Sequence, residues 1–199
     1  MKPVNEAMKW SVDSLMHSNH TPTWEDAVEM AEALAASDSR ANLLQIGWSD
    51  VGRPIHALVL TGSRAEVLED RNGVEEGIQA LTAWSKHRPQ GQALVLVNNA
   101  IHPGEPCGVN ASFALASEWL QTSTTLNHPL SNTSWVFVPQ YNVGGASRRN
   151  CCTRANQNGP VTYGFRGNAA NLDLNRDFIK MDSQNAEAFV SMFLSLIHI

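Results

Sequence analysis

The sequence has 199 residues, of which 43% are hydrophobic and 17% are charged. This composition supplies enough apolar surface for one domain with a sizeable core, and it argues against a disordered chain. The formal net charge is −5, without blocks of like charge and without a basic stripe, which argues against nucleic acid as a partner.

The cysteines and the N-terminus limit the class of protein further. No apolar run approaches the roughly 20 residues of a membrane-spanning helix, and the first ten residues lack the apolar segment of a signal peptide. The compartment stays open: cytoplasmic, or secreted or periplasmic if a leader precedes the printed sequence. Cys151 and Cys152 are adjacent and are not expected to pair, no CxxC motif occurs, and Cys107 is expected to be a buried free thiol.

The first half of the chain predicts a helix followed by a hairpin. Thr23 and Asp26 stand in capping-box spacing ahead of an apolar stripe with helical period. Residues 42–49 and 54–62 have the composition of two strands, separated by a short turn. The polar segment that follows gives little signal beyond a short helix at 78–84.

The second half continues the alternation of strands and helices. The sequence predicts a buried strand at 93–98, a helix at 108–121, a buried strand at 135–138, an ordered loop at 140–171 and a final helix that starts after Asp182 or Ser183. Helices between apolar strands imply an α/β fold with a mixed β-sheet flanked by helices.

A histidine and a glutamate lie three residues apart where strand 93–98 ends. His102 and Glu105 enclose Pro103 and Gly104, which favour a tight turn. Imidazole and carboxylate both bind zinc, and catalytic zinc sites commonly have three protein ligands and a water. The pair could supply two of these ligands, with ligand atoms within ~5 Å of each other. The alternative is a surface turn that happens to hold both residues.

A second polar group lies in "NLDLNRDF", residues 171–178. In an extended segment Asp173 and Asn175 would project to one face and Arg176 to the other, unless the strand ends there. A guanidinium binds a carboxylate through two hydrogen bonds, and Asn adds a directed donor. Asp173 is a candidate to accept a hydrogen bond from a metal-bound histidine. The alternative is a solvated polar turn with a local salt bridge.

These two groups together resemble the motifs of the zinc carboxypeptidase (metallocarboxypeptidase) family. Their amino-acid sequences look most similar to those of a bacterial subgroup. The segment 47–61, "GWSDVGRPIHALVLT", resembles the strand pair that precedes the family's metal turn. Residues 142–145, Asn-Val-Gly-Gly, fall where the family has Asn-Pro-Asp-Gly, so the usual Pro and Asp are missing. The resemblance covers roughly residues 20 to 193.

The resemblance implies a phosphorylase/hydrolase-like fold and zinc-dependent hydrolysis of C-terminal peptide bonds. It implies that His102 and Glu105 bind Zn²⁺ and that Asp173 is the carboxylate that accepts a hydrogen bond from the ring of His102. It also implies that Asn175 and Arg176 hold the terminal carboxylate of a peptide or small amide substrate.

The family also uses an arginine that polarises the scissile carbonyl and stabilises the oxyanion. Rough spacing favours Arg154 for this catalytic role. Arg148, Arg149 and Arg166 are competitors, and any of the four could instead merely tie down the loop.

Two parts of the family's site are not matched: a third zinc-binding histidine and a glutamate general base, both expected beyond residue 193. His198 lies only five residues after Phe193, which is too early in the sequence for the third zinc ligand. It also lies in "LSLIHI", residues 194–199, which matches the translation of one reading frame of a transposase adapter used in sequencing libraries. We therefore interpret residues 1–193 as the N-terminal part of a single catalytic domain and residues 194–199 as a non-native tail.

The missing parts leave the activity open. Residues 1–199 alone are expected to bind zinc weakly and to be inactive as a peptidase. Two other functions fit the same residues: a zinc amide deacylase of small N-acyl amino acids, and a non-catalytic binding domain on the same scaffold.

Overall fold

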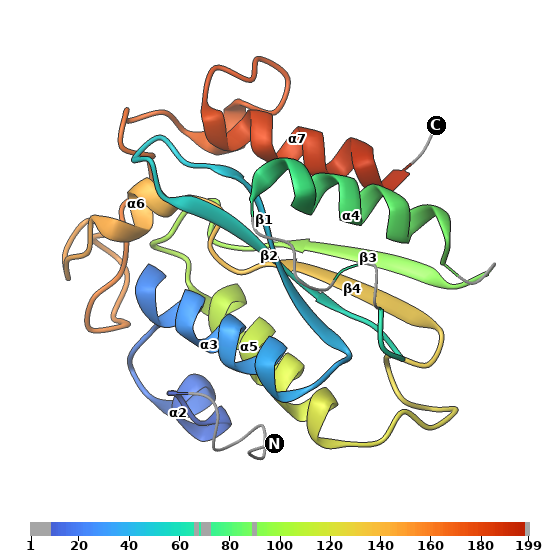
Figure 1. The fold of residues 1–199 in the computed structure, drawn as a ribbon. Coiled ribbons are helices and arrows are strands. Elements are labelled where there is room, and N and C mark those ends of the chain that lie inside the picture. Colours follow the sequence, from blue (N-terminus) through green and yellow to red (C-terminus); the bar gives the residue numbers. More distant parts are fainter. Residues whose placement is uncertain (1–8, 66–67, 69–72, 89–90, 198–199) are drawn as a thin grey trace.

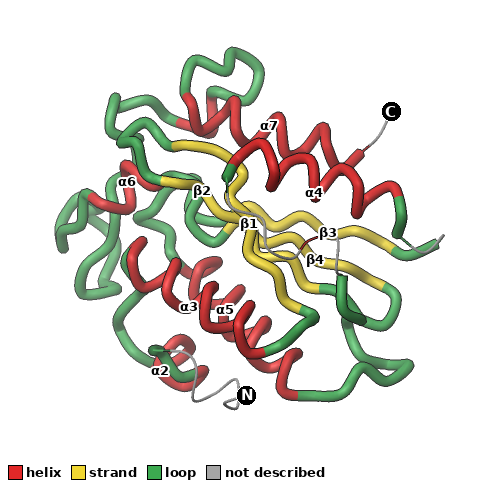
Figure 2. The backbone as a smooth tube through the Cα atoms, viewed as in Figure 1, coloured by secondary structure: helices red, strands yellow, loops and turns green. Residues whose placement is uncertain are grey.

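A mixed four-stranded sheet forms the middle layer of the molecule (Figures 1 and 2). The computed structural model describes residues 9–65, 68, 73–88 and 91–197. The strands are β1 (Ala41–Trp48), β2 (Pro54–Leu60), β3 (Ala93–Asn98) and β4 (Thr133–Val138), in the spatial order β1-β2-β4-β3. β2 is antiparallel to β1 and to β4, whereas β3 and β4 are parallel, which confirms the predicted mixed sheet.

Helices cover both faces of this sheet. α2 (Val12–His17), α3 (Trp24–Ser37) and α5 (Cys107–Gln121) lie on one face, while α4 (Val74–Lys86) and α7 (Gln184–Ile197) lie on the other (Figure 1). Each face has its own buried apolar cluster, so the sheet is packed on both sides. This three-layer arrangement confirms the predicted α/β class.

Local signals explain where the helices begin. The Thr23 hydroxyl accepts a hydrogen bond from the Asp26 backbone N–H, and the Asp26 side chain accepts one from the Thr23 N–H, so the predicted capping box is present. Ser183 Oγ accepts from the Ala186 backbone N–H at 3.1 Å and begins α7. A Cβ on Gly47 would stand 2.1 Å from the Ala188 Cβ, so only glycine lets β1 and α7 approach this closely.

Several expectations differ from the observed fold. α4 has 13 residues, almost twice the predicted short helix, because its amphipathic face packs on β1. β3 is half-buried rather than buried, because it lies at the edge of the sheet. The loop predicted at 140–171 contains the short helix α6 (Val143–Ser147) and an isolated β-bridge between Asn150 and Tyr163.

The cysteines also differ from expectation. Cys151 and Cys152 form a disulfide with each other, which the sequence did not predict. The pair lies directly after the bridge residue Asn150, where the loop turns and both side chains are exposed. Cys107 is a free thiol as expected, but it is exposed because it occupies the first turn of α5.

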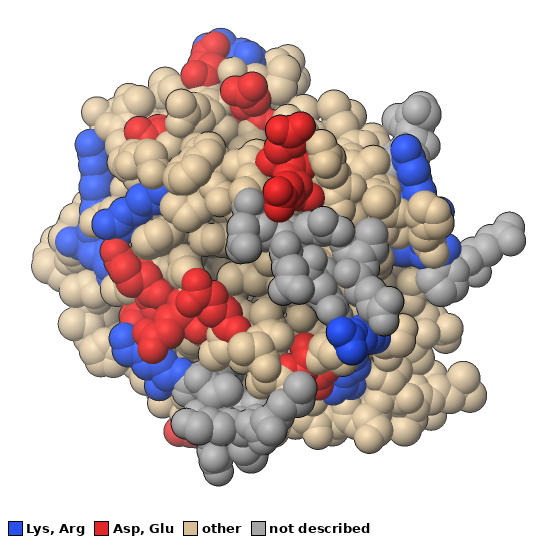
Figure 3. All heavy atoms as spheres, in the orientation of Figure 1, with Lys and Arg blue, Asp and Glu red and all other residues tan. Residues whose placement is uncertain are grey.

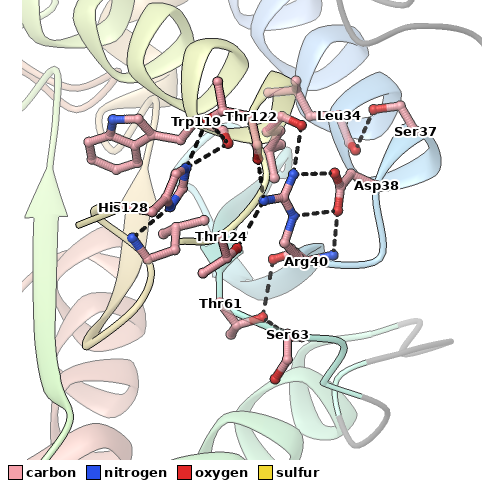
Figure 4. A network of polar contacts seen from close by, with 12 residues as sticks. Leu34, Ser37, Asp38, Arg40, Thr61, Ser63, Trp119, Thr122, Thr124 and His128 are labelled. Carbon is pink, nitrogen blue, oxygen red and sulfur yellow. Dashed lines mark hydrogen bonds and ion pairs between the residues drawn. The ribbon is translucent and has the colours of Figure 1, made fainter. Parts of the chain in front are cut away.

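The end of α5 is fixed by a polar network (Figure 4). Arg40 pairs with Asp38 at 2.7 Å and donates to the backbone carbonyls of Leu120 and Thr122 at 2.6 and 2.8 Å. His128 Nε2 lies 3.0 Å from the Trp119 carbonyl. The last carbonyls of a helix lack partners within the helix, so this network satisfies them and joins α5 to the connection between α3 and β1.

The surface and the helices bear on possible partners. On the face shown in Figure 3, acidic side chains gather at the upper centre and at the lower left, and basic ones lie mainly toward the left and right of the view. None of the described helices is both long and apolar enough to span a bilayer.

The boundary predicted at residue 194 is not tested by the fold. α7 runs to Ile197 and so includes four of the six residues of the predicted tail. His198 lies outside the described residues. The assignment of residues 194–199 stays a prediction.

Candidate metal centre

The turn after β3 is held from two sides. The Glu105 N–H donates to the His102 carbonyl at 2.8 Å, which closes the tight turn predicted from Pro103 and Gly104. The chain after β4 extends the pairing beyond the strands, since the Tyr141 N–H donates to the Asn99 carbonyl at 3.1 Å. The turn is therefore anchored to the end of the parallel strand pair, where α/β sheets commonly bind ligands.

His102 and Glu105 point toward each other. His102 is only 5% exposed, and its Nδ1 lies 3.5 Å from Glu105 Oε1, inside the separation expected from the sequence. Two ligand atoms bound at ~2.1 Å to a tetrahedral zinc stand roughly 3.4 Å apart. The observed separation therefore fits a shared metal ion.

The other ring nitrogen of His102 is occupied by Asp173. Nε2 lies 2.8 Å from Asp173 Oδ1, and an ionised carboxylate only accepts hydrogen bonds. Nε2 therefore carries the proton, and the lone pair of Nδ1 faces Glu105. Metal-bound histidines are commonly fixed by such a carboxylate.

Asp173 is strongly held as an anion. Burial raises its pKa, but the hydrogen bonds from His102, from the Asn175 backbone N–H and from Arg166 outweigh this effect and lower the pKa to about 2. Asp173 Oδ1 also accepts the Asn175 N–H at 3.0 Å, while Oδ2 accepts Arg166 Nε and Nη2 at 3.2 and 3.0 Å. The carboxylate that orients His102 is thus fixed on several sides.

The segment that carries Asn175 and Arg176 is not extended. Leu174–Arg176 form one 3₁₀ turn, because Asp173 caps the Asn175 N–H and Leu174 is fully buried. The alternation of faces expected for an extended segment therefore does not apply here. Asn175 and Arg176 are both exposed, next to the Asp173 carboxylate that contacts His102.

Arg176 is not used in a salt bridge within the described part of the chain. Its Nη1 donates only to the Asn175 carbonyl, at 2.9 Å. The neighbouring Asp177 instead accepts from the Ser183 N–H at 3.0 Å and from the Asp182 N–H at 2.8 Å, at the start of α7. The guanidinium of Arg176 therefore remains accessible to a ligand.

The four candidate arginines occupy different positions. Arg154 Nη2 donates to Glu105 Oε1 at 2.7 Å. Arg166 contacts Asp173. Arg148 donates to the Ala169 carbonyl within the loop, and Arg149 donates to the Thr21 carbonyl in the N-terminal segment. Of these four, only Arg154 donates a hydrogen bond to a side chain of the His102–Glu105 turn.

Gly104 makes the position of Arg154 possible. A Cβ at residue 104 would stand 2.5 Å from Arg154 Nε and 3.1 Å from the Gly164 carbonyl oxygen. Burial raises the pKa of Glu105, but the hydrogen bond and charge of Arg154 outweigh burial, so this pKa lies below its ordinary value. Glu105 is therefore a carboxylate at neutral pH, the form that binds metal ions.

Sequence reasoning gave Asn142 no role of its own. Asn142 is fully buried, and its Nδ2 donates to the Ile101 and Arg166 carbonyls at 3.1 and 3.2 Å. Its Oδ1 accepts the Gly145 N–H at 2.8 Å. It thus joins the start of the His102–Glu105 turn to the loop that carries Arg166. Its place after β4 is the only signal in the sequence.

The set of ligands is not complete in the described residues. No group of three or more His, Cys, Asp or Glu side chains with metal-binding geometry occurs among residues 9–65, 68, 73–88 and 91–197. His102 and Glu105 fit as two ligands of a zinc ion by donor chemistry and by separation.

Comparisons with known proteins agree with this geometry. Residues 27–191 match the family model described as zinc carboxypeptidase, and the chain therefore belongs to the zinc carboxypeptidase family. Members of this family are zinc-dependent metalloproteases that act on peptides. A search of curated proteins gave no significant match.

Solved structures show the same fold at low identity. A candidate carboxypeptidase from Burkholderia mallei ATCC 23344 and a metallo-carboxypeptidase from Burkholderia cenocepacia are each 17% identical, with a TM-score of 0.57 over 89% of this chain. Thrombin activatable fibrinolysis inhibitor is 12% identical, with a TM-score of 0.57 over 96% of this chain. The chain spans 37%, 38% and 48% of these three proteins, respectively.

Proposed function

We propose that this chain forms part of a zinc carboxypeptidase that removes C-terminal residues from peptides. The observation that carries the proposal is the His102 ring, whose Nε2 is held by Asp173 while its Nδ1 faces Glu105 at 3.5 Å. Such an arrangement places one nitrogen and one carboxylate oxygen at a separation that suits two ligands of the same ion. The third ligand and the general base are proposed to follow residue 193 in the full-length protein.

Each residue has a separate task in this proposal. Zinc, when bound, lowers the pKa of a water toward 7 and polarises a carbonyl group. Asp173 keeps His102 in one tautomer and one orientation. Arg154, beside Glu105, donates to the carbonyl oxygen as negative charge develops on it. Arg176 and Asn175 bind the free carboxylate of the substrate.

Product analysis of the full-length protein tests this function. A peptide with a free C-terminus should lose single C-terminal amino acids, and a chelator should stop the release. The same peptide with an amidated C-terminus should react far more slowly. Release from small N-acyl amino acids but not from peptides would instead identify an amide deacylase. Binding of such ligands without any release would identify a non-catalytic domain.

The role of Asp173 can be separated from that of the ligands. Asp173→Asn keeps the size of the side chain but removes the anion that accepts the hydrogen bond from His102 Nε2 and pairs with Arg166. We expect zinc affinity to fall by about 10- to 100-fold, the usual effect of losing such a partner. Chelator competition with the full-length protein measures this. Unchanged zinc affinity would contradict the role.

A further inference from the structure

We propose that a pocket beside Glu105 binds the side chain of the penultimate substrate residue and selects for uncharged groups. The pocket has a volume of about 590 Å³, within the usual range for small-molecule sites. It adjoins the His102–Glu105 turn, because Gly104, Glu105 and Pro106 line it. This inference rests on the proposed function, because it assigns a substrate group to the same centre.

The wall opposite the turn comes from the N-terminal segment 15–21. Asn110 on α5 fixes this segment: its Nδ2 donates to the Leu15 and His20 carbonyls at 2.8 and 3.2 Å, and its Oδ1 accepts from Thr21 Oγ1 at 2.8 Å. The Val161 N–H donates to the Asn19 carbonyl at 2.8 Å. The pocket therefore has walls fixed by hydrogen bonds, and it lies open between α5 and the loop that carries Arg154.

This wall lies outside the part of the chain that matches the family. The match begins at residue 27, whereas segment 15–21 precedes it. Arg149 strengthens the attachment, since its Nη2 donates to the carbonyls of Thr21 and Thr162 at 2.9 and 2.8 Å. One wall of the pocket is thus built by residues that precede the segment on which the family assignment rests.

The position of the pocket indicates which part of a substrate reaches it. Asp173 and the following Asn175 and Arg176 lie on the Nε2 side of His102, whereas the pocket lies on the Nδ1 side, past Glu105. A substrate whose terminal carboxylate meets Arg176 and whose scissile carbonyl lies at His102 and Glu105 extends its acyl part toward the pocket. The group that enters is the side chain before the scissile bond.

The lining of the pocket favours uncharged groups. Glu105 is the only Asp, Glu, Lys or Arg among the lining residues, and Arg154 already pairs with it at 2.7 Å. Apolar atoms of Leu15 and Ala111 and polar groups such as Gln157 make up the rest. A charged side chain would lose water there without gaining a partner of opposite charge. An uncharged side chain loses little and gains contacts.

A substitution that fills the pocket tests the assignment. Ala111 lines the pocket from α5, so Ala111→Phe should obstruct it. With full-length protein and peptides that differ only at the penultimate residue, wild type should prefer leucine over glycine and over aspartate. Ala111→Phe should lower the leucine-to-glycine ratio of kcat/KM by about tenfold, a factor that corresponds to about 1.4 kcal/mol.

Leu115→Phe is the matched control. Leu115 lies one turn along α5, is 38% exposed and does not line the pocket. This variant should keep the wild-type ratio. An unchanged ratio in Ala111→Phe, or an equal loss in both variants, would overturn the assignment.

A measurement that does not require peptide cleavage tests the pocket independently of the proposed function. Cys107 lines the pocket and is an exposed free thiol, so its alkylation can be followed by peptide mass mapping. A peptide with penultimate leucine should slow the alkylation, and one with penultimate glycine should not. If no peptide is cleaved by wild type, the proposed function fails, and protection of Cys107 still decides the pocket. Equal alkylation rates with both peptides would overturn it.

Discussion

Replacing His102 by alanine in the full-length protein should remove bound zinc and lower kcat/KM for peptide hydrolysis by roughly three orders of magnitude or more. The substitution deletes the Nδ1 ligand and also leaves Asp173 without its histidine partner. A catalytic metal contributes several kcal/mol to stabilisation of the transition state, and each ~1.4 kcal/mol corresponds to tenfold in rate. Metal content and kcat/KM are measured on the same preparations.

The control for this variant is His87→Ala. His87 is exposed near the end of α4, where its Nδ1 bonds only to the Ala83 carbonyl within the described residues, at 2.7 Å. This variant should keep both zinc and activity. A His102→Ala protein that still binds one zinc and cleaves peptides would exclude His102 as a ligand.

The second large effect concerns the substrate's terminal carboxylate. Arg176→Ala should lower kcat/KM by roughly 10- to 100-fold for a peptide acid and far less for the matching amide, since a charge-assisted bidentate contact contributes about 1.5–3 kcal/mol. Arg176 forms no ion pair with the described residues, so its loss should change the melting temperature little. Steady-state kinetics on the acid and amide pair measure the effect.

Arg176→Lys gives a graded comparison for the same site. An ammonium group cannot reproduce the planar fork of the guanidinium, so only part of the activity on the acid should return. Equal losses on acid and amide, together with a lowered melting temperature, would show that Arg176 stabilises the fold and would remove it from the substrate site.

The parts of the fold that the sequence predicted depend on contacts between near neighbours. The capping box of α3 joins residues three apart, and the β1–β2 hairpin is closed by a short turn. The His102–Glu105 turn is equally local. For such features, residue type and spacing carry the physical cause.

The parts that were wrong or missed depend on distant contacts. β3 has an apolar sequence but lies at the edge of the sheet, and strand order is not encoded in the strand itself. The four arginines are chemically alike in the sequence. Only the folded loop brings Arg154 to Glu105 and Arg166 to Asp173. The pocket wall formed by the N-terminal segment was missed because it depends on a contact between Asn110 and His20, which are about ninety residues apart in the sequence.

The Asp173–Arg176 segment lies between these two cases. The residue types made Asp173 a candidate to accept a hydrogen bond from a metal-bound histidine, and the structure has a hydrogen bond from His102 to Asp173 at 2.8 Å. The segment is not extended, because the buried Leu174 and the bond from the Asn175 N–H turn the chain into a 3₁₀ helix. Capping by Asp173 was a local signal that a strand-based reading overlooked.

The position of the metal is the most direct test of the account. A crystal structure of the full-length protein grown with zinc, with anomalous data collected at the zinc edge, locates the ion without reference to activity. We expect one strong peak at about 2.0–2.2 Å from both His102 Nδ1 and a Glu105 carboxylate oxygen, with Nε2 still bonded to Asp173. A peak bound through Nε2, or a peak away from the His102–Glu105 turn, would contradict the account.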